Sequence, residues 1–117
     1  MDISKKMEND VLILTLSGDL MGGPETVQFK KLIDETIEDE IIQVVVDMAQ
    51  VQWMNSSGLG MLISALTSLR SSSGDLRLAN LSDRIRRPLE ITRLDTVFQQ
   101  FNAVSDAVSS FKLRSMP

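Results

Sequence analysis

Strand-like apolar segments alternate with segments of helical periodicity along the chain, and this alternation limits the folds that it can adopt. Residues 11–16 and 41–48 are rich in Val, Ile and Leu, as expected for strands buried on both faces. Residues 75–80 alternate between polar and apolar side chains, which is typical of a third strand. Between these segments, apolar residues recur every three or four positions, as on the buried face of a helix. Strands that alternate with helices predict an α/β domain with a largely parallel sheet.

The predicted order of elements is β-β-α-β-α-β-α-β-α, in one mixed, mostly parallel sheet of four to five strands with about four helices. The connections are only a few residues long, and the sequence contains no linker and no internal repeat. Two cores of half this size would each bury too little surface, so we expect a single domain over residues 1–117. Shorter strands are expected over residues 3–7 and 97–101, and helices from Pro24, from Ser56 or Ser57, from Ser82 and over residues 104–111.

The chain contains no histidine, no cysteine and no tyrosine. These absences exclude a Ser-His-Asp triad, a thiol nucleophile, a disulfide and a zinc–thiolate site. Carboxylates and lysines remain, but no cluster in the sequence combines a base with a nucleophile. The acidic run Glu38-Asp39-Glu40 is interpreted as a solvated helix end, with a Mg²⁺ or Ca²⁺ site as the alternative. We therefore expect a protein that is not an enzyme and that holds no cofactor and no metal.

The net charge of −4 argues against nucleic acid and anionic membranes as partners, because both are bound through many Lys and Arg contacts. The first ten residues lack the apolar stretch of a signal peptide. No apolar run approaches the ~20 residues that a membrane-spanning helix needs. Cytoplasmic localisation is therefore expected.

Two adjacent serines, Ser56 and Ser57, stand where a predicted strand passes into a strongly amphipathic helix. From the local pattern they are helix caps, and Gly58 and Gly60 permit close packing of the helix on the sheet. The alternative is that one hydroxyl is phosphorylated. A phosphoserine carries a charge of roughly −1.5 to −2, which a helix N-terminus tolerates. Phosphorylation would then change the exposed surface and leave the fold intact.

Other motifs in the sequence carry less chemistry. The Gly58-Leu59-Gly60 segment lacks the Gly-Lys-Ser/Thr ending of a phosphate-binding loop. No glycine precedes the serines as it does in a nucleophile elbow. Pro88 is expected to bend the third helix or to delay its start. The same helix region carries Arg84, Arg86, Arg87 and Arg93, which are interpreted as a solvated face able to meet an acidic partner.

The segment from Asp47 to Leu62 resembles the signature of the STAS domain family of bacterial anti-sigma factor antagonists. That signature is a buried strand ending in Asp, a short apolar loop, and Asp-Ser-Ser/Thr-Gly-Leu-Gly at the start of a helix. This chain has Asp47, a six-residue spacer, Met54, Asn55, Ser56, Ser57, Gly58, Leu59, Gly60, Met61 and Leu62. The resemblance covers nearly the whole chain, including Gly18-Asp19-Leu20 and residues 81–95.

The resemblance implies a STAS fold and a partner-switching role. In the family, the unphosphorylated protein binds an anti-sigma factor that is also a serine kinase, and the sigma factor is released. The kinase phosphorylates the first serine of the motif, Ser56 here, and a PP2C-type phosphatase restores binding. The remaining residues of the implied partner-binding site are Asp19, Met21, Gly22, Asn55, Ser57 and Gly58.

Two departures from the family pattern concern the partner. Asn55 replaces the family's Asp beside the phosphoserine, which removes one charge. Met21-Gly22-Gly23 stands where many antagonists carry Asp and further polar residues. Met21 and Trp53 are interpreted as an apolar rim, with a core position as the alternative for Trp53. Asn55 also keeps open a second hypothesis, a STAS scaffold subunit that is never phosphorylated and that regulates a transporter or a multiprotein complex.

Overall fold

A five-stranded sheet forms the centre of the computed structural model, which describes the backbone of residues 1–115 and the side chains of residues 1–111. The strand order is β1-β2-β3-β4-β5. The first strand pairs antiparallel with the second, and all other pairs are parallel. The strands are β1 (Asp2–Glu8), β2 (Val11–Leu20), β3 (Gln43–Met54), β4 (Asp75–Ala79) and β5 (Gln99–Phe101).

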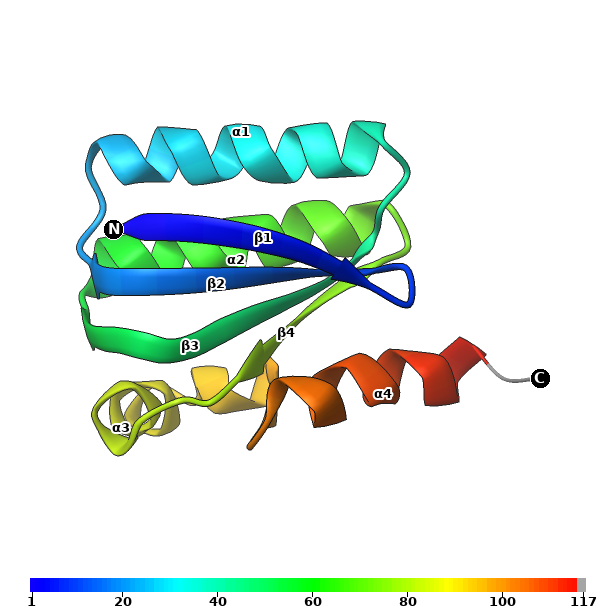
Figure 1. Ribbon diagram of the computed structural model, residues 1–117. Helices are drawn as coiled ribbons and strands as arrows, with labels where there is room; N and C mark the ends of the chain where they lie inside the picture. Colours follow the sequence, from blue (N-terminus) through cyan, green and yellow to red (C-terminus); the bar gives the residue numbers. More distant parts are fainter. Residues whose placement is uncertain (116–117) are drawn as a thin grey trace.

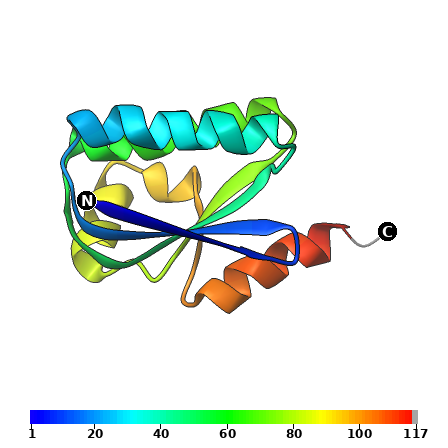
Figure 2. The same ribbon diagram turned by 45° about the horizontal axis from the view of Figure 1, so that its top comes forward.

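Helices cover both faces of this sheet (Figures 1 and 2). On one face lie α1 (Pro24–Glu38) and α2 (Ser56–Ser71), and on the other lies α4 (Val104–Ser115). A short helix, α3 (Asp83–Ile91), and the 3-10 turn η1 (Leu94–Thr96) follow β4 and precede β5. The predicted mixed sheet and four helices are therefore confirmed, and residues 116–117 of the predicted domain lie outside the described residues.

Alternate residues of the central strands point to opposite faces, and both faces are buried. In β2, Leu12 and Leu14 pack in the core under α1 and α2, whereas Val11 and Ile13 pack with the α4 residues Ala107, Val108 and Phe111. This two-sided burial explains why the sequence of β2 is continuously apolar and does not alternate.

The strands β2 and β3 run past their predicted ends, residues 16 and 48. They continue as a pair to Leu20 and Met54, with register shifts after Thr15 and after Gly18. The positive φ of Gly18, 98°, fits the second of these irregularities. The short apolar loop expected before the serines is therefore strand, and this prediction was wrong. In α3, which begins at Asp83, Pro88 lies inside the helix and does not delay its start.

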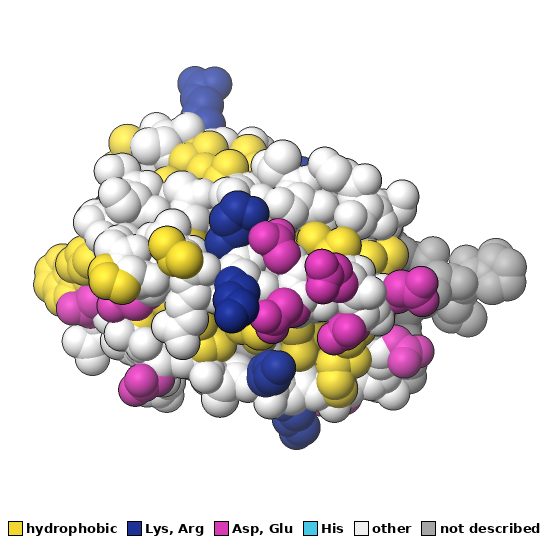
Figure 3. Space-filling model, turned by 90° about the horizontal axis from the view of Figure 1, so that it is seen from above, with side chains coloured by type: hydrophobic (Ala, Val, Ile, Leu, Met, Phe, Trp, Pro, Cys, Tyr) yellow, Lys and Arg dark blue, Asp and Glu magenta, His cyan; other side chains and the backbone are white. Residues whose placement is uncertain are grey.

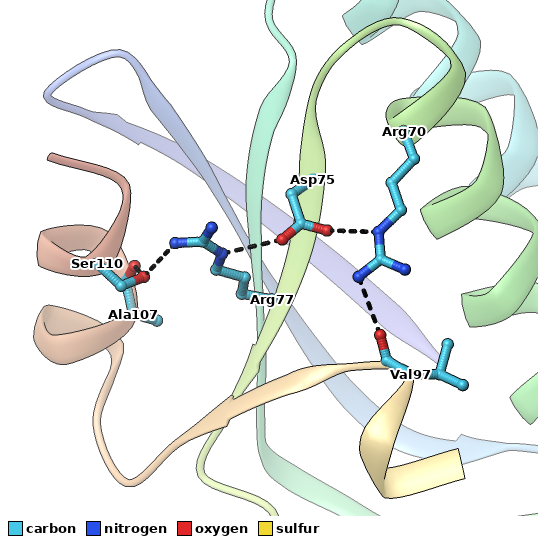
Figure 4. Close-up of polar contacts among 6 residues, drawn as sticks. All are labelled: Arg70, Asp75, Arg77, Val97, Ala107 and Ser110. Atoms are coloured by element: carbon cyan, nitrogen blue, oxygen red, sulfur yellow. Dashed lines mark hydrogen bonds and ion pairs between the residues drawn. The ribbon is translucent and has the colours of Figure 1, made fainter. Parts of the chain in front are cut away.

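A buried ion pair ties β4 to its neighbours (Figure 4). Arg77 is only 1% exposed, and its Nε donates to the Asp75 carboxylate at 3.0 Å. The same carboxylate accepts from Arg70 of α2 at 3.1 Å. The Arg77 guanidinium also donates to the Ser110 hydroxyl at 2.6 Å and lies 3.9 Å from the centre of the Phe111 ring. These contacts fasten α2 and α4 to the same strand.

The beginning of the chain is fastened to the first turn of α1. The amino group of Met1 lies 3.4 Å from the carboxylate of Glu25. The chain therefore starts beside the carboxyl end of β2, whereas α4 runs toward the opposite end of the molecule (Figure 1).

Candidate functional site

The carboxyl ends of β2 and β3 bring the predicted site residues to one end of the sheet. At this end β2 passes into α1 through residues 21–23, and β3 passes into α2 at Asn55. The last residues of the two strands, Leu20 and Met54, are paired. The loop after β2 and the first turn of α2 consequently lie side by side, at the left of Figure 1.

Asn55 links these two segments. Its side-chain oxygen Oδ1 accepts a hydrogen bond from the backbone N–H of Gly58 at 2.9 Å, which makes Asn55 the N-cap of α2. Its Nδ2 donates to the carbonyl oxygen of Met21 at 2.9 Å, and its backbone N–H donates to the carbonyl oxygen of Leu20 at 3.1 Å. One side chain therefore both caps the helix and holds the loop.

The prediction that Ser56 or Ser57 caps the helix was wrong, because Asn55 occupies the cap. Asparagine is as good an N-cap as serine, and that preference was a signal that could have identified it. Ser56 is the first residue of α2 and is exposed. Within residues 1–111, its hydroxyl makes no hydrogen bond. The Ser56 oxygen is consequently accessible and is not needed to hold the helix.

Two glycines permit the close approach of the loop and the helix. A Cβ atom added to Gly58 would lie 2.1 Å from the carbonyl oxygen of Leu20. Gly22 has a φ of 85°, and a Cβ there would lie 2.7 Å from Cβ of Ser57. Gly60 differs, because an added Cβ would meet nothing within 4 Å. The predicted role in close packing thus holds for Gly58 and was wrong for Gly60.

Two large apolar side chains are exposed at this end of the sheet. Met21 is 46% exposed and Trp53 is 49% exposed, so the core alternative for Trp53 was wrong. The apolar rim formed by these two side chains stays a prediction. The guanidinium carbon of Arg84, from α3, lies 4.2 Å from the centre of the Trp53 ring. The two residues are 31 positions apart in the sequence, so no local pattern could have predicted that they stack.

Asp19 of β2 and Asp47 of β3 differ in their surroundings. Asp19 is exposed on β2, one residue before Leu20, and no ion pair holds it within the described part of the chain. Asp47 is half-buried, and its Oδ1 accepts from Asn80 at 3.0 Å and from the N–H of Ala49 at 3.1 Å. Asp47 therefore fastens β3 to the end of β4, whereas Asp19 is free to meet a partner.

The described residues contain no group of three or more carboxylates that could together hold a metal ion. None of the described helices is both long enough and apolar enough to cross a membrane. The reactive group that the structure leaves accessible at this end of the sheet is the hydroxyl of Ser56, at the N-terminus of α2.

The STAS domain family matches residues 2–107 of the chain. Among curated relatives, an anti-sigma-B factor antagonist of Listeria monocytogenes is 40% identical over 60 residues, covering 51% of this chain and 53% of the relative. The match thus spans about half the length of that relative. An anti-sigma-B factor antagonist of Bacillus subtilis is 27% identical over 93 residues, covering 80% of this chain and 83% of the relative.

Solved structures share the fold. A crystal structure from Thermotoga maritima superposes with a TM-score of 0.85 at 24% identity, covering 92% of each chain. The Bacillus cell fate determinant SpoIIAA in its phosphorylated form superposes with a TM-score of 0.74 at 18% identity, covering 94% of this chain and 99% of that one. The family match over residues 2–107 agrees with the strand order and the helix layers, and the chain belongs to the STAS domain family.

Proposed function

We propose that this chain is an anti-sigma factor antagonist that acts in the cytoplasm as a binding partner and kinase substrate, without catalysis of its own. Unphosphorylated, it binds an anti-sigma factor that is also a serine kinase, and the sigma factor is released. Phosphorylation of Ser56 ends the binding, and a PP2C-type phosphatase restores it. The accessible Ser56 hydroxyl, at a helix start that Asn55 already caps, is the observation that carries this proposal.

The position of Ser56 favours a switch that leaves the fold intact. The first-turn N–H groups of a helix carry a partial positive charge that stabilises an added phosphate. The Gly58 N–H keeps its bond to Asn55, so the cap survives phosphorylation. The phosphate therefore acts on the surface, where its charge and volume oppose a bound partner.

The other members of the proposed site have separate roles. Asn55, Gly22 and Gly58 hold the loop and the helix start in one shape, through the hydrogen bonds and close approaches given above. Met21 and Asp19 are exposed and offer the partner an apolar contact and a charge. Both serines are exposed, but Ser57 lies close to Gly22 of the loop, and we therefore expect Ser56 to be the phosphate acceptor.

Reconstitution tests the proposal. The chain is incubated with ATP and each anti-sigma factor kinase of its source organism, and its mass is followed. We expect the cognate kinase to add one phosphate, mapped to Ser56. The Ser56→Ala variant should bind that kinase and remain unmodified, whereas the matched Ser57→Ala variant should be modified like the wild type. Phosphate confined to other residues, or none with a kinase that binds, would contradict the proposal.

The alternative scaffold role stays a prediction. Co-purification with the wild-type chain and with the Ser56→Asp variant distinguishes it from the antagonist role. A STAS scaffold subunit should co-purify with a permease or a transport ATPase, and its Ser56→Asp variant should stay in that complex. An antagonist should co-purify with the kinase, and Ser56→Asp should abolish that association.

A further inference from the structure

Trp53 and Arg84 form an exposed stacked pair beside the proposed site. The guanidinium lies 4.2 Å from the ring centre, within the range of a cation–π contact. The ring is nevertheless 49% exposed, so half of a large apolar surface remains in water. Tryptophan and arginine are among the residues enriched at the positions that dominate binding energy at interfaces. The pair is therefore suited to contact a partner.

The charge around this pair differs from that of the rest of the chain. Residues 83–93 hold four arginines and two carboxylates, whereas the whole chain carries a net charge of −4. Arg86 is occupied, because it donates to the carbonyl oxygen of Leu81 at 3.2 Å and lies 3.6 Å from Asp83. Arg84 and Arg87 are exposed and form no ion pair within the described part of the chain. This helix thus presents unpaired positive charge on an acidic protein.

The exposed apolar surface continues along α3. Ile91 is 76% exposed and lies seven residues, or two turns, after Arg84, so both are on one side of the helix. Trp53 lies near the end of β3 and precedes the start of α2 by three residues, so this surface and Ser56 lie at the same end of the sheet. We call the set Trp53, Arg84, Arg87 and Ile91 the α3 surface.

We propose that the α3 surface binds an acidic, partly apolar surface of the anti-sigma factor and so extends the interface around Ser56. This inference rests on the proposed function. Charge complementarity carries it, because unpaired arginines attract carboxylates and the exposed Trp53 and Ile91 side chains bury apolar area on contact. Desolvation on binding also strengthens the Trp53–Arg84 stack.

An acidic partner also accounts for the action of phosphate at Ser56. A phosphoserine dianion repels carboxylates that approach from the partner, and the repulsion is strongest where water is excluded. The arginines of α3 attract the partner's carboxylates, and a phosphate on Ser56 repels them. The switch is therefore electrostatic. Binding should therefore weaken as the salt concentration rises.

The opposite side of the molecule supplies the control. On the face covered by α1, acidic and basic side chains lie beside one another with apolar patches between them (Figure 3). Lys31 is exposed on α1, so Lys31→Glu makes the same change of two charge units as Arg84→Glu, away from α3. Arg84→Lys keeps the charge and loses the planar stack on Trp53.

The test measures binding of the cognate anti-sigma factor by calorimetry and follows Trp53 by ¹⁹F NMR. Trp53 is the only tryptophan, so 5-fluorotryptophan labelling gives one resonance from the α3 surface. We expect this resonance to shift on binding. Arg84→Glu should weaken binding by about tenfold or more, Arg84→Lys by less, and Lys31→Glu by less than about twofold. Thermal melting of each variant verifies that it is folded.

Three outcomes would count against the inference. An unshifted Trp53 resonance in a complex whose affinity Arg84→Glu leaves unchanged would overturn it and leave the proposed function standing. An equal loss of affinity for Arg84→Glu and Lys31→Glu would show that binding depends on the net charge of the chain. It would contradict specific binding by the α3 surface. Failure of wild-type chain to bind any anti-sigma factor would contradict the proposed function itself, and this inference with it.

Discussion

The side-chain amide of Asn55 donates to the carbonyl oxygen of Met21 at 2.9 Å, across 34 residues of sequence. The amide meets both neighbours, because its NH₂ group donates to the Met21 oxygen and its oxygen accepts from the Gly58 N–H. A carboxylate, as in the family signature, would accept from the Gly58 N–H but would repel the carbonyl oxygen of Met21. The replacement of Asp by Asn therefore couples the loop at residues 21–23 to the helix that carries Ser56.

Asn55→Asp tests this coupling. We expect nearly unchanged global stability, since the lost hydrogen bond of about 1 kcal/mol is partly offset by a charge at the helix N-terminus. The backbone amides of Gly22 and Gly23 should show lower NMR order parameters, because the loop is no longer held. Asn55→Ala, which loses the cap as well, should destabilise the fold by about 1–2 kcal/mol. Unchanged order parameters in Asn55→Asp would show that the Asn55 side-chain amide does not hold the loop.

Substitutions at Ser56 separate binding from folding. Ser56→Asp should bind the anti-sigma factor poorly and yet melt near the wild-type temperature, because the helix N-terminus accepts negative charge. Ser56→Ala should bind constitutively, since the cap belongs to Asn55. Differential scanning calorimetry and a binding titration on the same preparations check both statements. Unfolding of Ser56→Asp would refute the argument from the helix terminus.

The two glycines of the motif should respond oppositely to alanine. Gly58→Ala places a Cβ against the Leu20 carbonyl and should cost about 2–3 kcal/mol of unfolding free energy. Gly60→Ala meets open space in a helix interior and should stabilise the protein by about 0.5–1 kcal/mol. Urea unfolding of the pair gives both values. Equal effects would mean that the close approach at Gly58 is relieved by a small shift of the loop.

The buried ion pair of β4 predicts an asymmetry between two arginines that share Asp75. Arg77→Ala should cost about 3 kcal/mol, because it opens a buried site under α4 and removes a partner of a buried carboxylate. Arg70→Ala should cost about 1 kcal/mol or less, since its side chain is 46% exposed. Denaturant unfolding, with near-ultraviolet circular dichroism reporting on packing, measures the difference.

The order of strands and helices could be predicted from sequence because apolar periodicity is a local property. The continuously apolar run of residues 11–14 predicts a strand buried on both faces. In the structure both faces of this strand are covered. The ends of β2 and β3 could not be predicted in this way. Several of the last residues of these strands are polar or glycine, so the local sequence does not favour a strand there. Pairing between β2 and β3, which are distant in sequence, keeps both strands extended to Leu20 and Met54.

In the candidate site too, features with a local sequence signal could be predicted, and contacts between distant segments could not. The motif placed Ser56 correctly at the start of α2, and the choice of Asn55 as cap was within reach of residue preferences. The bond to Met21 and the stacking of Arg84 on Trp53 join segments that only the fold brings together. Arg77 was unexpected because a charged residue in an alternating strand usually faces water. Asp75, two residues away and on the same face, was the available signal.

The fastening of Met1 to Glu25 has a practical consequence for handling this protein. Any residues attached before Met1, such as an affinity tag or a fluorescent label, would emerge beside the first turn of α1, at the end of the sheet that holds Ser56. If the proposed function holds, such a tag would obstruct the kinase and lower its binding, as phosphorylation of Ser56 is proposed to do. A label joined after α4 emerges at the far end of the molecule and is the appropriate choice for interaction assays.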